Sequence, residues 1–169
     1  PESDKPEFII AATEYTSIWQ SDGQKIVKSI EDATKLKFKT GAIYAVTFEG
    51  ISYSVPMRLR SSYSHSHKEA TVIHELLHRL LVDHDFWLFD SSNHSEDVHK
   101  IIDLVLYDVW VDVLGKKIAG ESKEKEISYG DPAYKNAWEW ALKFSKSQRA
   151  KEFKKLVEKY ANRKPQSSS

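Results

Sequence analysis

The spacing of apolar residues changes along the chain, and each change predicts a different element. Residues 8–12 form a short apolar run, which favours a buried strand, with the start of a helix as the alternative. Between residues 15 and 36 the apolar positions recur every three or four residues, which predicts an amphipathic helix. The sequence Ser21-Asp22-Gly23 lies inside this helix and indicates an interruption.

The next segment is typical of strands. Residues 42–48 are rich in β-formers, and Glu49-Gly50 predicts a turn after them. Residues 51–59 alternate strictly between apolar and polar side chains, which predicts a half-exposed strand. Because Pro56 has no N–H to donate to a neighbouring strand, we expect residues 51–59 to form an edge strand.

Two long helices follow. The spacing of apolar residues predicts a helix over residues 68–83, with a buried stripe of Ile73, Leu77, Leu80 and Leu81. A second helix is predicted over residues 95–117, with Ser95, Glu96 and Asp97 favouring its start and Gly115 or Gly120 its end.

The remaining sequence completes the predicted organisation. Residues 120–132 are charged and contain glycine, which favours a linker, and residues 132–160 predict a last helix. Strands followed by helices indicate an α+β fold, with a small mixed sheet and a helical C-terminal half. We expect a flexible lead-in over residues 1–7, a single domain over residues 8–162 and a disordered tail over residues 163–169.

Composition narrows the classes of function. The 25 basic residues balance the 25 acidic ones, so we expect no nucleic-acid partner and no docking on an anionic membrane. The chain has no run of apolar residues long enough to span a bilayer. It also has no cysteine, so a transition-metal site must use histidines and carboxylates. The absence of cysteine and of a visible signal peptide favours the cytoplasm, and the oligomeric state stays open.

One motif carries specific chemistry. His74-Glu75-Leu76-Leu77-His78 is an HExxH motif inside the predicted helix 68–83. Residues i and i+4 lie one turn apart on the same helix face, so both imidazoles can bind one ion. Zinc is the expected cofactor, and Glu75 is placed to accept a proton from the water that a catalytic zinc activates. The alternative is a pair of surface histidines on an amphipathic helix.

The motif and its surroundings resemble the zincin superfamily of metallopeptidases. In zincins a helix and a small sheet with an exposed edge strand precede the HExxH helix, and the substrate backbone lies along that edge. The resemblance implies a zincin-like fold in which residues 51–59 form the edge strand over the active-site helix. It also implies a peptide or protein substrate bound along this strand.

The third metal ligand has two main candidates. His84 follows His78 with the spacing of the metzincin branch, but that branch has glycine where this chain has Leu81 and a methionine turn downstream, whereas the single methionine here is Met57. His99 begins the sequence His99-Lys100-Ile101-Ile102-Asp103, which resembles the gluzincin ExxxD pattern with histidine in place of glutamate.

We therefore predict His99 as the third ligand, with His84 as the alternative. The resemblance implies that Asp103 holds one of the ligand histidines by a hydrogen bond. His94, Asp103 and Asp108 are further candidates for the third ligand.

Several other residues have a predicted role. Tyr107 lies one turn beyond Asp103 and is a candidate donor to a developing oxyanion, with packing as the alternative. Asp108 and Asp112 are expected to form buried ion pairs, with Arg79 as a suggested partner. His65 and His67 belong to a serine-rich loop that is expected to be exposed, with lining of the cleft as the alternative.

The sequence thus predicts a zinc-dependent hydrolase, and a peptidase in particular, in which Glu75 is the general base. The alternative is a non-catalytic module that uses zinc as a brace, closed by a fourth ligand such as His84 or His94, and binds a partner along the edge strand. A third reading is an α+β domain in which the motif is fortuitous and binds no metal.

Overall fold

The computed structural model describes residues 5–39, 41–85 and 94–161. Within them the chain is mostly helical and carries a small three-stranded mixed sheet, which agrees with the predicted α+β class. The elements in chain order are α1 Pro6–Thr34, β1 Ala45–Phe48, β2 Tyr53–Ser54, β3 Met57–Arg60, α2 His65–Asp83, α3 His94–Leu114, α4 Lys116–Ile127, α5 Pro132–Ala141 and α6 Lys146–Ala161.

The first helix corrects three predictions. Residues 8–12 belong to α1 and form no strand, and Pro6 starts this helix inside the expected lead-in. The helix also continues through Gly23. A Cβ atom at Gly23 would lie 2.8 Å from the ring of Trp19, so the glycine makes room for that ring and does not break the helix. The apolar run at its start is helical because Phe8, Ala11 and Tyr15 bury one face.

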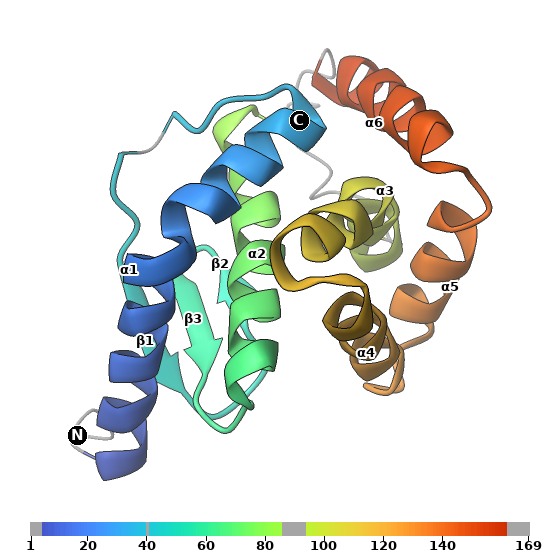
Figure 1. Ribbon diagram of the computed structural model, residues 1–169. Coiled ribbons are helices and arrows are strands. Elements are labelled where there is room, and N and C mark those ends of the chain that lie inside the picture. The colour runs from blue at the N-terminus through green and yellow to red at the C-terminus, as the bar shows by residue number, and fades with distance from the viewer. Residues whose placement is uncertain (1–4, 40, 86–93, 162–169) are drawn as a thin grey trace, which may run out of the picture.

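The sheet has the order β1-β3-β2 (Figure 1). Strand β1 pairs in parallel with β3, from Ala45 opposite Met57 to Phe48 opposite Arg60, and β2 pairs with β3 in the antiparallel sense. The prediction of one edge strand over residues 51–59 is therefore wrong. Pro56 lies in the turn between β2 and β3, so residues 51–59 divide into β2, which is an edge strand, and β3, which is the central strand and buries Met57 and Leu59.

Helix α3 is the centre of the molecule (Figure 1) and contacts each of the other five helices that the structure describes. Trp110 on α3 stacks on Trp138 of α5, with ring centroids 5.6 Å apart, and its indole N–H donates to the carbonyl oxygen of Ala70 on α2. These contacts fix α2 against α3, the two helices that carry the candidate ligands. The predicted stripe of α2 is buried, as expected.

The helical C-terminal half differs from the prediction in its boundaries. The expected linker over residues 120–132 is wrong for most of its length, because α4 buries Ala119, Ser122 and Glu126 along one face. The predicted last helix is divided into α5 and α6. Ser145 directly precedes α6 and marks its start, because its backbone N–H and its hydroxyl both donate to the side chain of Gln148 in the first turn of that helix.

Among the described residues, no helix is both long and apolar enough to cross a membrane. The tail predicted over residues 163–169 lies outside the described residues.

Candidate metal centre

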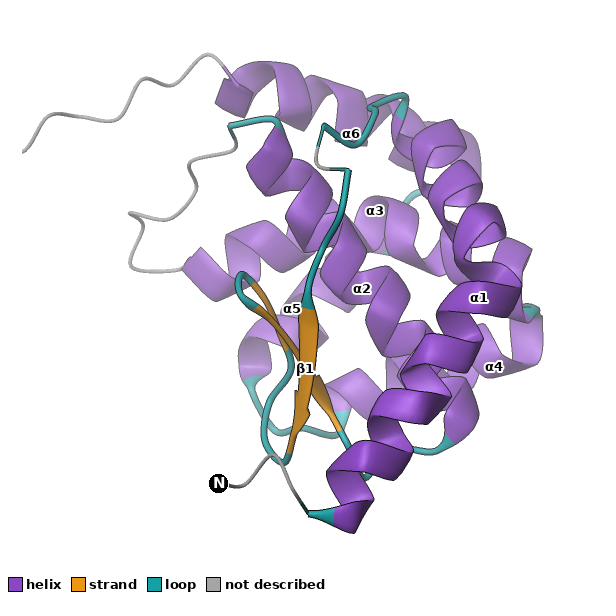
Figure 2. Ribbon diagram, turned by 90° about the vertical axis from the view of Figure 1, so that its left-hand side faces the viewer, coloured by secondary structure: helices purple, strands orange, loops and turns teal. Residues whose placement is uncertain are grey.

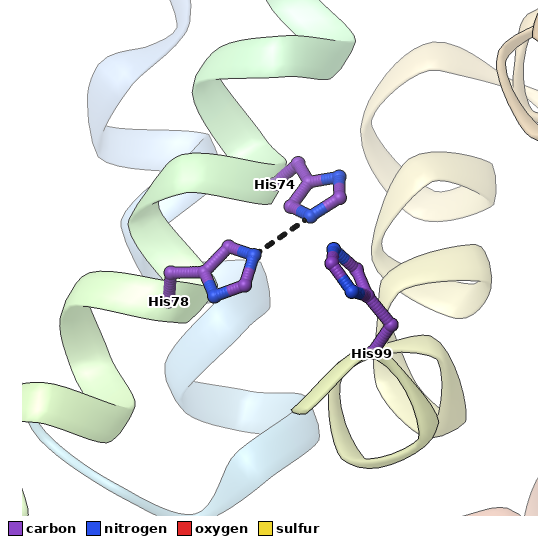
Figure 3. Close-up of side chains that lie close together, drawn as sticks. All are labelled: His74, His78 and His99. Carbon is purple, nitrogen blue, oxygen red and sulfur yellow. Dashed lines mark hydrogen bonds between the residues drawn. The ribbon is translucent and has the colours of Figure 1, made fainter. Parts of the chain in front are cut away.

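Three histidines from two helices come together in the structure (Figure 3). His74 and His78 lie one turn apart on α2, and His99 faces them from α3. One ring nitrogen of each lies within 4.8 Å of those of the other two. The structure thus brings together the three residues that the sequence predicts as ligands.

The spacing of the imidazoles suits one shared ion. The Nε2 atoms of His74 and His78 are 3.0 Å apart, and the ring of His99 stands edge-on to both, with centroid separations of 5.3 and 5.2 Å. Two nitrogens that bind one tetrahedral zinc ion at about 2.05 Å lie about 3.3 Å apart. The separation of 3.0 Å between His74 and His78 is close to this value.

His99 provides the test of whether the group fits a metal. Its Nδ1 atom donates a hydrogen bond to the carbonyl oxygen of Ser95 at 2.6 Å, which leaves the lone pair on Nε2. That Nε2 atom is buried and has no hydrogen-bond partner. Burial, followed by the charge of His74, lowers the pKa of His99 to about 4, so the ring is neutral at pH 7. A buried, neutral imidazole with an unused lone pair is the form that binds a metal.

His74 is held by a carboxylate from another helix. Its Nδ1 atom donates to Oε1 of Glu126 on α4 at 2.5 Å, while Oε2 of Glu126 accepts the indole N–H of Trp138 at 2.9 Å. Burial lowers the pKa of His74, but the charge and hydrogen bond of Glu126 outweigh it and the pKa is raised. The hydrogen bond leaves Nε2 of His74 directed towards the shared centre, as carboxylates do for histidine ligands in zinc sites.

Sequence reasoning missed Glu126, because it placed this residue in a linker. A usable signal is the spacing of Ala119, Ser122 and Glu126, which puts two small residues and one acid on a single helix face. The role predicted for Asp103, holding a ligand histidine, falls to Glu126 in the structure.

Asp103 is fully buried, and neither of its carboxylate oxygens has a hydrogen-bond partner. It lies one turn after His99 on α3. Burial, and secondarily the charge of Glu126, raises the pKa of Asp103 well above its ordinary value. Since Glu126 accepts two hydrogen bonds and Asp103 accepts none, the surroundings favour the charged form of Glu126 and the neutral form of Asp103.

Glu75 is buried beside His74, and no hydrogen bond or ion pair joins its carboxyl group to another described residue. Burial raises the pKa of Glu75 to about 7, against an opposing effect from His74 and a smaller reinforcing one from Glu126. A carboxyl group with this pKa can both accept and release a proton near neutral pH.

The tyrosine nearest to the histidines is not the predicted one. The ring of Tyr107 packs edge-on to Trp138, with centroids 6.4 Å apart, and belongs to the partly buried shell of the core. Instead, Tyr134 in the first turn of α5 lies with its ring centroid 4.3 Å from that of His99. Burial, and then the charges of Glu126 and Glu75, raise the pKa of Tyr134, so its hydroxyl stays protonated.

The other candidate ligands lie elsewhere or are not described. His84 caps the C-terminal end of α2, and its Nε2 atom bonds to the carbonyl oxygen of Lys37 at 2.8 Å. The side chain of His94 lies outside the described residues. Asp108 is part of a two-pronged ion pair with Arg149 of α6, at 2.7 and 3.1 Å, so the suggested pairing with Arg79 is wrong.

His65 and His67 belong to the first turn of α2 and not to a loop. The Nε2 atom of His67 lies 3.1 Å from the hydroxyl of Tyr129, which is itself 2.7 Å from the hydroxyl of Tyr63. This chain of polar contacts joins the start of α2 to the end of α4.

Comparison of the chain with models of known protein families, with curated proteins and with solved structures finds no match in any of the three. Its function is therefore inferred from the geometry of the three histidines and the carboxyl groups around them.

Proposed function

We propose that the chain is a zinc-dependent hydrolase, and specifically a peptidase of the zincin type. The observation that carries the proposal is the convergence of His74, His78 and His99 on one point, with the buried Nε2 atom of His99 left without a partner. Among the described residues only these three form such a group. Three protein ligands and a remaining open position are typical of catalytic zinc, whereas structural zinc sites are closed by four.

The chain itself supplies the proton transfer. Zinc, when bound, lowers the pKa of water and polarises the carbonyl group of the substrate. Glu75 accepts a proton on its carboxylate from the attacking water and passes it to the leaving amine. Its pKa of about 7 suits both steps at neutral pH. Glu126 keeps His74 in the tautomer that binds metal.

The substrate in this proposal is an extended peptide. Strand β2 is the edge strand that lies against α2, and no strand of the described residues pairs with its outer side. We infer that a peptide pairs with β2 and so passes near α2, the helix that carries His74 and His78. In this proposal Tyr53–Ser54 is the substrate-binding edge that the sequence predicted over residues 51–59.

The test compares Glu75→Gln with the wild-type protein. Zinc content is measured by atomic absorption, and hydrolysis is followed with a mixture of fluorogenic peptides. We expect Glu75→Gln to keep one zinc ion per chain and to lose activity by about 100-fold or more, the size of a general-base effect. Glu69→Gln, on the same helix but outside the site, is the matched control and keeps full activity. Equal activity of Glu75→Gln and wild type contradicts the proposal.

A zinc-braced interaction module is the second candidate. It is favoured by the way the site joins three helices, since the histidines of α2 and α3 connect through Glu126 to α4. In this case wild type cuts no peptide in the mixture, and removal of the metal lowers the melting temperature of wild type and Glu75→Gln by the same amount.

A further inference from the structure

Strand β1 has one edge that no strand of the described residues covers. In the order β1-β3-β2 it lies at the end of the sheet, and Figure 2 views the molecule from this side. The carbonyl oxygen of Phe48 accepts the N–H of Ser61 at 2.8 Å, which directs Phe48 towards β3. Since backbone groups alternate along a strand, the N–H and C=O groups of Ala45 and Thr47 point to the free edge.

This edge lacks the features by which proteins keep strand edges apart. Natural edge strands are protected against pairing with another chain by charged side chains, by proline or by being very short. Strand β2, at the other end of the sheet, has only two residues and is followed by Val55 and Pro56, so it offers a short pairing site for a peptide but too little length to join two sheets. By contrast, residues 41–48 contain no charge and no proline, and Tyr44 and Val46 are 92% and 58% exposed.

An apolar pocket of about 590 Å³ lies beside β1, between α1, residues 41–43 and the inner face of the sheet. The hydroxyl groups in its wall are already used: Tyr15 donates to Arg60, Thr16 to Ala12 and Thr47 to Phe8, each at a backbone carbonyl oxygen. The pocket thus has space for the inward-facing side chains of an added strand, provided that they are uncharged and apolar.

We propose that this edge pairs with β1 of a second copy of the chain, antiparallel about a two-fold axis, which joins the two sheets into one. The pocket and the free edge of β1 suit an extended, uncharged segment of β-forming residues. The sequence Ile43-Tyr44-Ala45-Val46-Thr47, which leads into β1, is such a segment. A two-fold contact needs one surface that is complementary to itself, and β1 provides it. The balance of 25 basic and 25 acidic residues gives no net repulsion between copies.

Sedimentation equilibrium of the full chain, from micromolar to near-millimolar concentration, tests the proposal, with and without zinc. We expect a dimer in both cases, because β1 and the histidines lie in different parts of the fold. Val46→Lys places two like charges at the centre of the contact, and Ala45→Pro removes an N–H from the free edge while the N–H groups that face β3 remain. Both variants should be monomeric.

Val55→Lys is the matched control, since Val55 is 52% exposed, close to the value for Val46, but lies in the turn between β2 and β3. It should remain a dimer. Circular dichroism and the melting temperature establish that each variant is folded, and at least one of the two β1 variants must be folded for the comparison. A monomeric wild type at all concentrations, or a folded Val46→Lys variant that still dimerises, overturns the proposal, as does a wild type that stays monomeric but binds a separate peptide at this edge.

Discussion

Two imidazoles of the centre, those of His74 and His99, are held by different kinds of group, and this decides what single substitutions do. The Nδ1 atom of His99 is held by a backbone carbonyl group of its own helix, whereas that of His74 depends on the side chain of Glu126. A side chain can be removed by mutation, and a backbone carbonyl cannot. Glu126 is therefore the most informative residue next to the ligands.

Replacing Glu126 by Gln removes the charge that holds His74 but keeps the shape of the side chain. We expect zinc affinity to fall by about 10- to 100-fold, as for other carboxylates that hold a histidine ligand. Competition with a chromophoric chelator measures the affinity without reference to activity. Glu124→Gln, on the exposed side of the same helix, should bind zinc as wild type does. An unchanged affinity in Glu126→Gln contradicts the assigned role.

The raised pKa of Asp103 predicts that the stability of the fold depends on pH. Its pKa is raised in the folded chain, so the part of its burial cost that comes from ionisation is absent below the unfolded pKa of about 3.9, and the free energy of unfolding decreases as the pH rises above this value. Asp103→Asn removes this cost. In the presence of a chelator we expect the variant to be more stable than wild type at pH 8 by about 1 kcal/mol or more, and the difference to vanish near pH 4.

Urea denaturation at both pH values measures this difference. Asp112→Asn, at a largely exposed position of the same helix, is the control and should show little change. A variant that is less stable than wild type at pH 8 means that the Asp103 carboxylate is stabilised by a partner.

At the scale of elements, the turn between α3 and α4 decides whether Glu126 reaches His74. Gly115 occupies this turn with a φ angle of 87°, in the region that favours glycine, and directs α4 back across the molecule. The helix that follows has few apolar residues, so its place is set by the turn and by the contacts of its small residues. The periodicity of the sequence alone does not reveal this.

Two glycine substitutions should have opposite effects. Gly115→Ala forces a side chain into a left-handed conformation and should destabilise the chain by about 1 kcal/mol. Gly120→Ala lies inside α4, where a Cβ atom meets no other atom within 4 Å, and should stabilise it by about 0.5–1 kcal/mol. Thermal unfolding of the two variants measures both. A stabilising Gly115→Ala substitution contradicts the described turn.

For the whole molecule, the proposed metal site predicts that zinc binding and folding are coupled, because His74, His78 and His99 come from two helices that meet only in the folded chain. Zinc at about 100 times its dissociation constant should stabilise the fold by about 2.7 kcal/mol, and a chelator should remove this gain. His99→Ala should abolish the difference between the two conditions. His84→Ala should retain it, because His84 contacts Lys37 and lies outside the three-histidine group. Calorimetric scans with and without chelator distinguish the two candidate third ligands.

The sequence by itself determined the features that depend on local geometry. Residues four positions apart on a helix always share a face, so the HExxH motif fixed the approach of His74 and His78, and the periodicity of α2 located its buried stripe. The choice of His99 over His84 also agrees with the group that the structure forms.

Only the tertiary structure decided the features that depend on packing between distant segments. Glu126 lies 52 residues after His74, and no local pattern specifies their hydrogen bond. The same holds for the contact of Tyr134 with His99 and for the division of residues 51–59 into an edge strand and a central one. Periodicity records which side of an element is buried, but it does not record which other element covers that side.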